Sequence, residues 1–140
     1  MQKVLDQSNA GVSALKVVEK KVNAARDEIE KHQRDLQRLG EDYQKQVALL
    51  SESAKQEKQD QLIAKRKNIQ RMIADQKESV GKSKAKEIEK VVSNARKIIT
   101  ELATQDQYPI VIEQQAKMLV YIDPKFDLSA KVIAELNKRF

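Results

Sequence analysis

The sequence predicts a mainly α-helical protein in which a long antiparallel helical hairpin, a coiled-coil arm, stands on a small β-containing base. Apolar residues recur at coiled-coil spacing through most of the 140-residue chain. Charged residues make up 34% of the sequence and aromatic residues only 4%, which is too few for an ordinary compact core. The last quarter changes to short β-branched runs and turns. We therefore expect an arm over residues 13–104, with its tip near residues 51–56, and a base formed by residues 1–12 and 105–140.

The first helix is expected over residues 13–50, where mostly apolar side chains recur at spacings of three and four. This pattern of a and d positions continues over about five heptads, which is typical of a coiled coil. Its residues are Leu15, Val18, Val22, Ala25, Ile29, His32, Leu36, Leu39, Tyr43, Gln46 and Leu50. A helix of this length spans ~57 Å at ~1.5 Å per residue. Gly11 and Ser13 suit its start, with Ser13 as the expected N-cap.

A second helix is expected after a reversal at residues 51–53, because the apolar pattern returns between residues 62 and 102. Its stripe contains Leu62, Ile69, Ile73, Val80, Ile88, Val91, Ala95, Ile98 and Leu102. The heptad register continues only with a four-residue stutter near Val80, which changes the supercoil locally. We interpret Gly40 and Gly81 as positions where the hairpin can bend, and ordinary tolerated glycines are the alternative.

The base is expected to contain two short strands, over residues 109–113 and 117–122, after Pro109 ends the preceding helix. An isolated two-stranded hairpin is only marginally stable in water, and the sequence offers no third strand. We therefore expect the strands to mediate oligomerisation. The candidate oligomerisation residues are Ile110, Ile112, Leu119 and Tyr121. A final amphipathic helix is expected over residues 129–139, with Ser129 as its N-cap.

Residue usage argues against catalysis. The chain has no cysteine, which excludes disulfides and thiolate metal sites. Its single histidine, His32, argues against a histidine metal centre or a Ser-His-Asp triad. We interpret His32 and Tyr43 as packing residues of the helical stripe. The sequence has no glycine-rich phosphate loop, nucleophile elbow or metal-ligand spacing. It also has no apolar run of the ~18 residues that a membrane span needs. We expect neither enzymatic activity nor a cofactor.

Positive charge gathers in one stretch of a chain whose net charge is +6. Residues 54–90 contain eleven basic and six acidic residues. The candidate residues for attracting anionic partners are Lys55, Lys58, Lys65, Arg66, Lys67 and Arg71. A solvated helix face is the alternative. Among anionic partners, we expect a lipid or lipopolysaccharide surface rather than nucleic acid. Acidic residues interrupt the basic stretch, and no nearby aromatic residue can stack on a base.

Both ends of the chain resemble the OmpH/Skp family. Residues 121–129 read Tyr-Ile-Asp-Pro-Lys-Phe-Asp-Leu-Ser, and residues 132–137 read Val-Ile-Ala-Glu-Leu-Asn. They are similar to the family signature Tyr-x-Asp-Pro-x-x-Asp-(Ile/Leu)-(Thr/Ser), followed by a Val-x-x-x-Leu-Asn helix. Residues 1–5, Met-Gln-Lys-Val-Leu, resemble the segment before the family's long helix. The C-terminal block is fairly specific, whereas the coiled-coil middle would match many unrelated proteins.

The resemblance implies a periplasmic chaperone that holds unfolded outer-membrane proteins without ATP. It also implies a homotrimer with a β-barrel body made from strands of all three subunits, from which three helical hairpins project around a cavity. Family members carry a hydrophobic strand and a cleaved signal peptide ahead of the Met-Gln-Lys-Val-Leu segment. Because this sequence begins at Met1, we expect both to belong to a longer form of the chain.

Two other functions fit the residues. A structural coiled-coil adaptor would bind one folded partner with a defined stoichiometry, whereas a holdase binds many unfolded chains. A basic nucleic-acid-associated coiled coil would bind duplex DNA with an affinity that falls steeply with salt.

Overall fold

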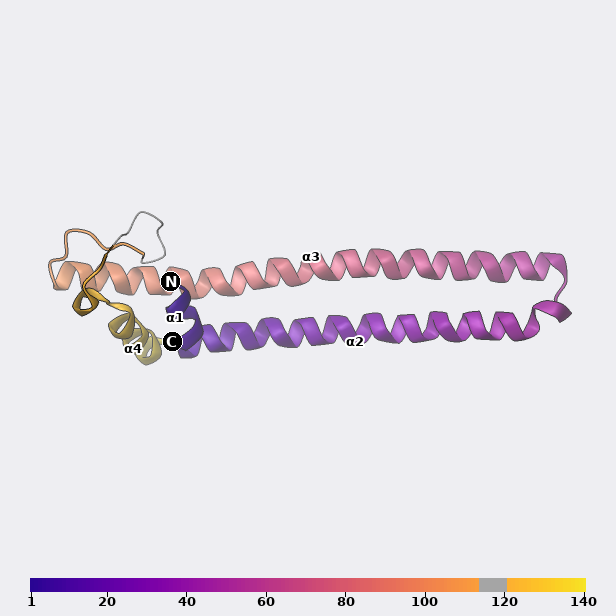
Figure 1. Cartoon of the computed structure of the whole chain (residues 1–140), viewed down its shortest axis with the longest axis horizontal. Coiled ribbons are helices and arrows are strands. Elements are labelled where there is room, and N and C mark those ends of the chain that lie inside the picture. The colour runs from indigo at the N-terminus through magenta and orange to yellow at the C-terminus, as the bar shows by residue number, and fades with distance from the viewer. Residues whose placement is uncertain (114–120) are drawn as a thin grey trace. The chain divides into compact units, whose positions relative to one another are not determined.

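The structure, a computed structural model, describes residues 1–113 and 121–140. The chain divides into two compact units, which we call the base unit (Met1–Val18 with Ser83–Phe140) and the arm unit (Glu19–Lys82). The helices in chain order are α1 (Gln2–Gln7), α2 (Asn9–Gln46), the 3-10 helix η1 (Val47–Leu49), α3 (Glu52–Gln105), the 3-10 helix η2 (Pro124–Phe126) and α4 (Ser129–Arg139), as shown in Figure 1.

The two long helices fit the expected hairpin, but the expected β-containing base and β-barrel body are wrong. Residues 1–113 and 121–140 contain no strand, and residues 109–113 follow an irregular path. Residues 117–120 of the second expected strand lie outside the described residues. A strand requires a neighbour for its backbone N–H and C=O groups. Among residues 1–113 and 121–140 this segment has no such neighbour, and Ile110 and Ile112 remain 73% and 55% exposed.

A tight corner joins α1 to α2 in the base unit. The Ser8 side chain is completely buried, and its Oγ accepts a hydrogen bond from the backbone N–H of Gly11 at 3.0 Å. This is the geometry of a helix N-cap, so α2 begins at Asn9 and the expected cap at Ser13 is wrong. Gly11 packs against α1 so closely that a Cβ would overlap the carbonyl oxygen of Leu5. The corner therefore requires glycine at this position.

The end of α3 is set by a backbone motif ahead of Pro109. Gln107 adopts a left-handed conformation with φ of 56°. The backbone N–H of Tyr108 donates to the carbonyl of Ala103 at 2.9 Å, and that of Gln107 donates to the carbonyl of Thr104 at 3.4 Å. This pair of bonds is a Schellman motif, which satisfies carbonyls that a helix end otherwise leaves unpaired.

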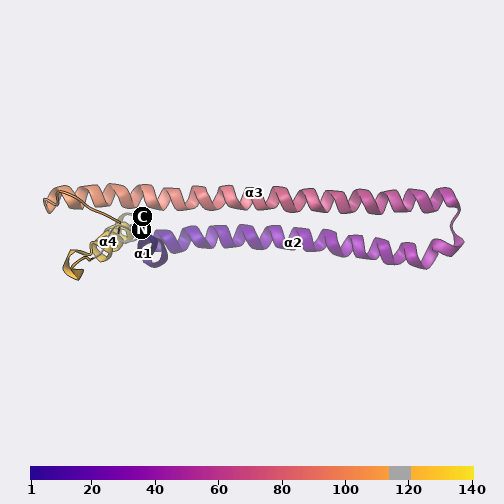
Figure 2. The same ribbon diagram turned by 45° about the horizontal axis from the view of Figure 1, so that its top comes forward.

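The core of the base unit joins four helical segments. Its buried residues are Val4 from α1, Ala14 from α2, Val91, Ala95 and Ile98 from α3, and Val132 and Leu136 from α4. Ala95 and Leu136 are 0% exposed. Helix α4 packs against α1, and Figure 2 shows the two side by side. The bounds of α4 match the expected helix, but the expected cap at Ser129 is wrong, because Ser129 is the first helical residue and the N-cap, Leu128, makes no side-chain cap bond. One residue earlier, Asp127 Oδ1 accepts from the backbone N–H of Ser129 at 2.9 Å.

The arm unit is held by a thin seam between α2 and α3, which lie side by side in Figures 1 and 2. Within the described part of this unit, Ala25 and Ile69 are the only buried apolar residues, at 8% and 6% exposed. Hydrogen bonds supplement them. Gln59 Nε2 donates to the Tyr43 hydroxyl at 2.9 Å, and Gln76 Nε2 donates to a Glu28 carboxylate oxygen at 2.8 Å. The seam therefore combines few apolar contacts with several polar ones.

The buried face of the helices differs in part from the expected stripe. Leu15, Val22 and Ile73 were expected in the seam but are 42%, 42% and 41% exposed, whereas Ala14 is buried. No helix in the described residues is long and apolar enough to cross a membrane.

Candidate functional site

An apolar surface lies where the base unit was expected to oligomerise. Ile110 and Ile112 line a cavity of about 620 Å³. Val111, from the same segment, and Phe126, from η2, line it too and are also exposed. Tyr121 is 78% exposed, whereas Leu119 lies outside the described residues. The other walls of the cavity come from α1, α3 and α4. The base unit thus presents apolar side chains that its own chain leaves uncovered.

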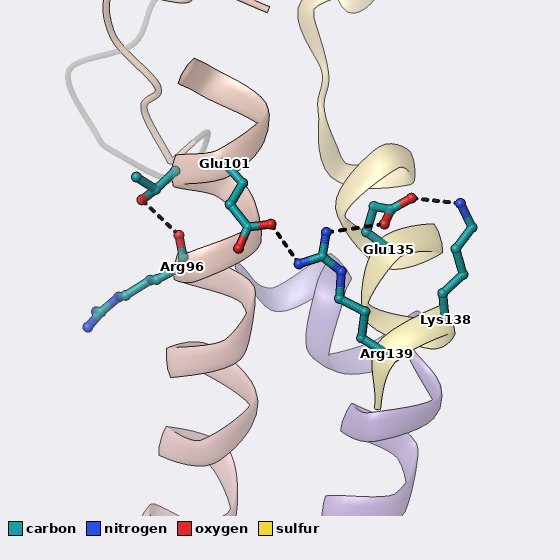
Figure 3. Close-up of polar contacts among 6 residues, drawn as sticks. Arg96, Glu101, Glu135, Lys138 and Arg139 are labelled. Carbon is teal, nitrogen blue, oxygen red and sulfur yellow. Dashed lines mark hydrogen bonds and ion pairs between the residues drawn. The ribbon is translucent and has the colours of Figure 1, made fainter. Parts of the chain in front are cut away.

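An ion-pair network fastens the C-terminal end of α4 to α3. The Arg139 guanidinium contacts Glu101 at 2.6 Å and Glu135 at 3.5 Å, and Lys138 pairs with Glu135 at 2.7 Å. Figure 3 shows Arg139 reaching from α4 to α3, while the side chain of Arg96 points away from the network. Glu101 raises the pKa of Arg139, and Lys138 lowers that of Glu135. These exposed pairs orient α4 more than they stabilise it.

A second polar contact joins α1 to the start of α4. The Asp127 carboxylate accepts hydrogen bonds from the side chain and backbone of Ser129, and it pairs with Lys3 Nζ at 3.0 Å. These interactions favour the ionised form and lower the pKa of Asp127 from 3.8 to about 2. A separate hydrogen bond joins α2 to the last turn of α4, because the backbone N–H of Asn9 donates to Asn137 Oδ1 at 2.7 Å.

The six candidate basic residues all lie on α3 in the arm unit, but they occupy different environments. Lys55 pairs with Glu52 at 2.6 Å, and Lys58 donates to Gln46 at 3.3 Å. Lys65 is half-buried. The exposed residues are Arg66, Lys67 and Arg71. About half of the set therefore faces α2 or local partners, and the other half remains available to solvent.

A hollow on the arm unit was missed at the level of sequence. Leu36, Gly40 and Tyr43 of α2 line it together with Leu62 and Arg66 of α3, and its volume is about 500 Å³. Gly40 was interpreted as a position where the hairpin can bend or as an ordinary tolerated glycine, and it lies inside α2, which runs from Asn9 to Gln46. The sequence contains one feature that could have indicated this hollow: the spacing from Leu36 to Gly40 to Tyr43 places a glycine between two large side chains on one helix face.

Catalytic groupings are not evident in the described part of the chain. Residues 1–113 and 121–140 hold no group of three or more His, Cys, Asp or Glu side chains placed to bind a metal ion. In the same residues, every buried side-chain nitrogen or oxygen has a hydrogen-bond partner.

Comparisons with known proteins place these features in a family. The family model described as outer membrane protein (OmpH-like) matches residues 1–136. A crystal structure from Caulobacter crescentus CB15, of a candidate outer membrane chaperone (OmpH-like), has a TM-score of 0.92 with this chain at 16% sequence identity. The match covers 100% of this chain and 82% of the other. A comparison with curated proteins finds no match.

Proposed function

Because the chain belongs to the OmpH-like outer membrane protein family, we propose that it is an ATP-independent holdase chaperone for unfolded outer-membrane proteins. The observation that carries this proposal is the family match over residues 1–136, which includes both the arm unit and most of the base unit. Unfolded β-barrel chains expose apolar residues and unpaired strand edges that aggregate readily. A protein that holds them between helical arms needs no reaction centre.

The arm unit has properties that suit a holding surface. Its seam buries few apolar residues, so apolar side chains such as Ile63, which is 58% exposed, remain at the surface. Arg66, Lys67 and Arg71 add exposed positive charge. Many weak contacts of both kinds would hold a client and release it quickly, and positive charge would speed the capture of acidic clients.

The base unit suits assembly. We propose that the exposed apolar residues Ile110, Ile112 and Tyr121 pack against other copies of the chain and that the assembly is a homotrimer. Burying such residues is favourable by roughly 25 cal/mol per Å² of apolar surface. The division of the chain into a base for assembly (1–12 and 105–140) and an arm for clients (13–104) remains part of this proposal.

The setting that fits this function is the periplasm, where unfolded outer-membrane proteins occur. We propose that the exposed cations of α3 also allow contact with anionic lipid or lipopolysaccharide. A structural adaptor is the alternative, and it differs in what it binds. An adaptor binds a folded partner, whereas a holdase binds an unfolded chain.

The direct test is an aggregation assay. An outer-membrane β-barrel unfolded in urea is diluted into buffer with and without the full chain, and light scattering is followed. The proposal expects suppression of scattering at about one trimer per client, without ATP. Unchanged scattering at that ratio would reject the holdase function, and binding only to a folded partner would favour the adaptor.

A further inference from the structure

We infer that the hollow beside Gly40 is a subsite for an aromatic side chain of an unfolded client, preferentially one next to an acidic residue. This inference rests on the proposed function and specifies which client features the arm recognises. The hollow lies entirely within the arm unit.

The floor of the hollow exists because Gly40 has no side chain. An added Cβ at Gly40 would meet no heavy atom within 4 Å, so the position opens onto free space. One turn away on either side, the half-buried side chains of Leu36 and Tyr43 form walls, and Leu62 closes the hollow from α3. A volume of about 500 Å³ lies within the range of sites that bind small organic groups.

The chemistry of the walls favours an aromatic ring. The Tyr43 hydroxyl accepts a hydrogen bond from Gln59 Nε2 at 2.9 Å, so the phenol ring has a partner on α3 and forms an aromatic wall of the hollow. Aromatic rings prefer to pack against one another edge to face or offset. Arg66 on the rim is exposed and offers its guanidinium to the face of a bound ring.

Charge complementarity selects the residues next to that ring. Of the cations in this stretch, Arg66 lines the hollow, whereas its neighbours Lys65 and Lys67 project in other directions from α3. A carboxylate adjacent to the aromatic residue would pair with Arg66, whereas a lysine would be repelled. Outer-membrane β-barrels carry girdles of aromatic residues, so an unfolded barrel offers this combination repeatedly.

The three glycines of the chain make a specific experiment possible. The full chain is labelled with ¹⁵N-glycine, which gives one amide resonance each for Gly11, Gly40 and Gly81. The probe is an unlabelled ten-residue Gly/Ser peptide that contains Asp-Trp, compared with peptides that contain Asp-Ala or Lys-Trp. The inference expects a saturable shift of the Gly40 resonance with Asp-Trp, a weaker one with Lys-Trp, and none with Asp-Ala.

Matched variants complete the test. Gly40→Leu places a side chain in the hollow, whereas Gly81→Leu makes the same change at a position that does not line this hollow and where a Cβ also meets nothing within 4 Å. Both variants are expected to fold, since leucine is a better helix former than glycine. The affinity of each variant is measured from the fluorescence of the peptide tryptophan, because Gly40→Leu has no Gly40 resonance and the chain has no tryptophan of its own. Gly40→Leu should weaken Asp-Trp binding by about tenfold, as expected for the loss of a buried aromatic group. Gly81→Leu should leave the affinity unchanged, and Arg66→Gln should remove the preference for Asp-Trp over Lys-Trp.

Two outcomes would overturn the inference. One is a Gly40 resonance that does not respond to Asp-Trp, and the other is an equal loss of affinity in Gly40→Leu and Gly81→Leu. The aggregation assay separates this from the proposed function. If the chain suppresses aggregation but the Gly40 resonance does not shift with Asp-Trp, the subsite alone is rejected. If the Gly40 resonance shifts but aggregation is not suppressed, the holdase function alone is rejected.

Discussion

At the scale of single residues, Gly11 lies where α2 passes over the backbone of α1, and its Cα faces the carbonyl of Leu5. We expect Gly11→Ala to lower the free energy of unfolding by about 1–3 kcal/mol, because the new methyl group overlaps backbone that cannot rotate away. Chemical denaturation followed by circular dichroism measures the change.

Gly81→Ala provides the control for this substitution. Its added Cβ meets nothing within 4 Å inside α3, so the variant should gain up to about 1 kcal/mol from improved helix propensity. Equal effects of the two substitutions would contradict the close approach at Gly11.

Asp127 predicts a pH dependence. Its pKa of about 2 in the folded chain lies below the ordinary value of 3.8 because Ser129 and Lys3 stabilise the carboxylate. A lowered pKa stabilises the folded state above pH 4, and this contribution is lost as the pH falls toward 2. Asp127→Asn should therefore reduce the melting temperature at pH 7 and have progressively less effect between pH 4 and pH 2. A constant difference across that range would mean that the carboxylate charge is not the cause.

At the scale of elements, α4 is attached by its apolar face rather than by its charges. Leu136 is 0% exposed in the base core, whereas the pairs of Arg139 with Glu101 and Glu135 lie at the surface. Leu136→Ala should destabilise the base by about 2–5 kcal/mol, as for other large-to-small substitutions in cores. Arg139→Gln should change the stability little, because exposed ion pairs contribute little. Thermal denaturation of both variants tests this ranking, and a larger effect of Arg139→Gln would reverse it.

The helices could be predicted from the sequence because each depends on its own periodicity. The bounds of α4 followed from its apolar face, and the two long helices followed from heptad spacing. Which residues are buried was predicted less accurately than where the helices lie. Heptad spacing gives the repeat of buried positions along a helix but not which of two adjacent faces packs against the partner. In α2 the small Ala14 is buried and the larger Leu15 is exposed.

The expected strands could not be derived correctly from local sequence. Residues 109–113 have a strand-like composition, yet strand formation depends on a hydrogen-bonding neighbour that the sequence does not specify. The hollow beside Gly40 was missed for a related reason, because two of its lining residues, Leu62 and Arg66, come from a distant stretch of chain. The expected caps at Ser13 and Ser129 were also wrong. Ser8 Oγ accepts from the N–H of Gly11, and Asp127 Oδ1 accepts from the N–H of Ser129.

At the scale of the whole molecule, the proposal assigns assembly to exposed apolar residues such as Ile110 and Tyr121, and client binding to the arm unit. Ile110→Asp should shift the assembly toward monomers, because a charge would be buried in the proposed interface. Sedimentation velocity measures this, with Lys138→Asp as a surface control that introduces the same residue away from the segment. A full-size assembly of Ile110→Asp would remove this segment from the interface.

The holdase proposal is tested most directly by the mass of the complex formed with one outer-membrane β-barrel in two states. The barrel is added to the full chain either unfolded, by dilution from urea, or folded in detergent micelles. The mass of each complex is then determined by sedimentation velocity. A holdase should form a soluble complex of about one trimer per barrel with the unfolded form and none with the folded form. A complex with the folded barrel, or no soluble complex with the unfolded one, would contradict the proposed function.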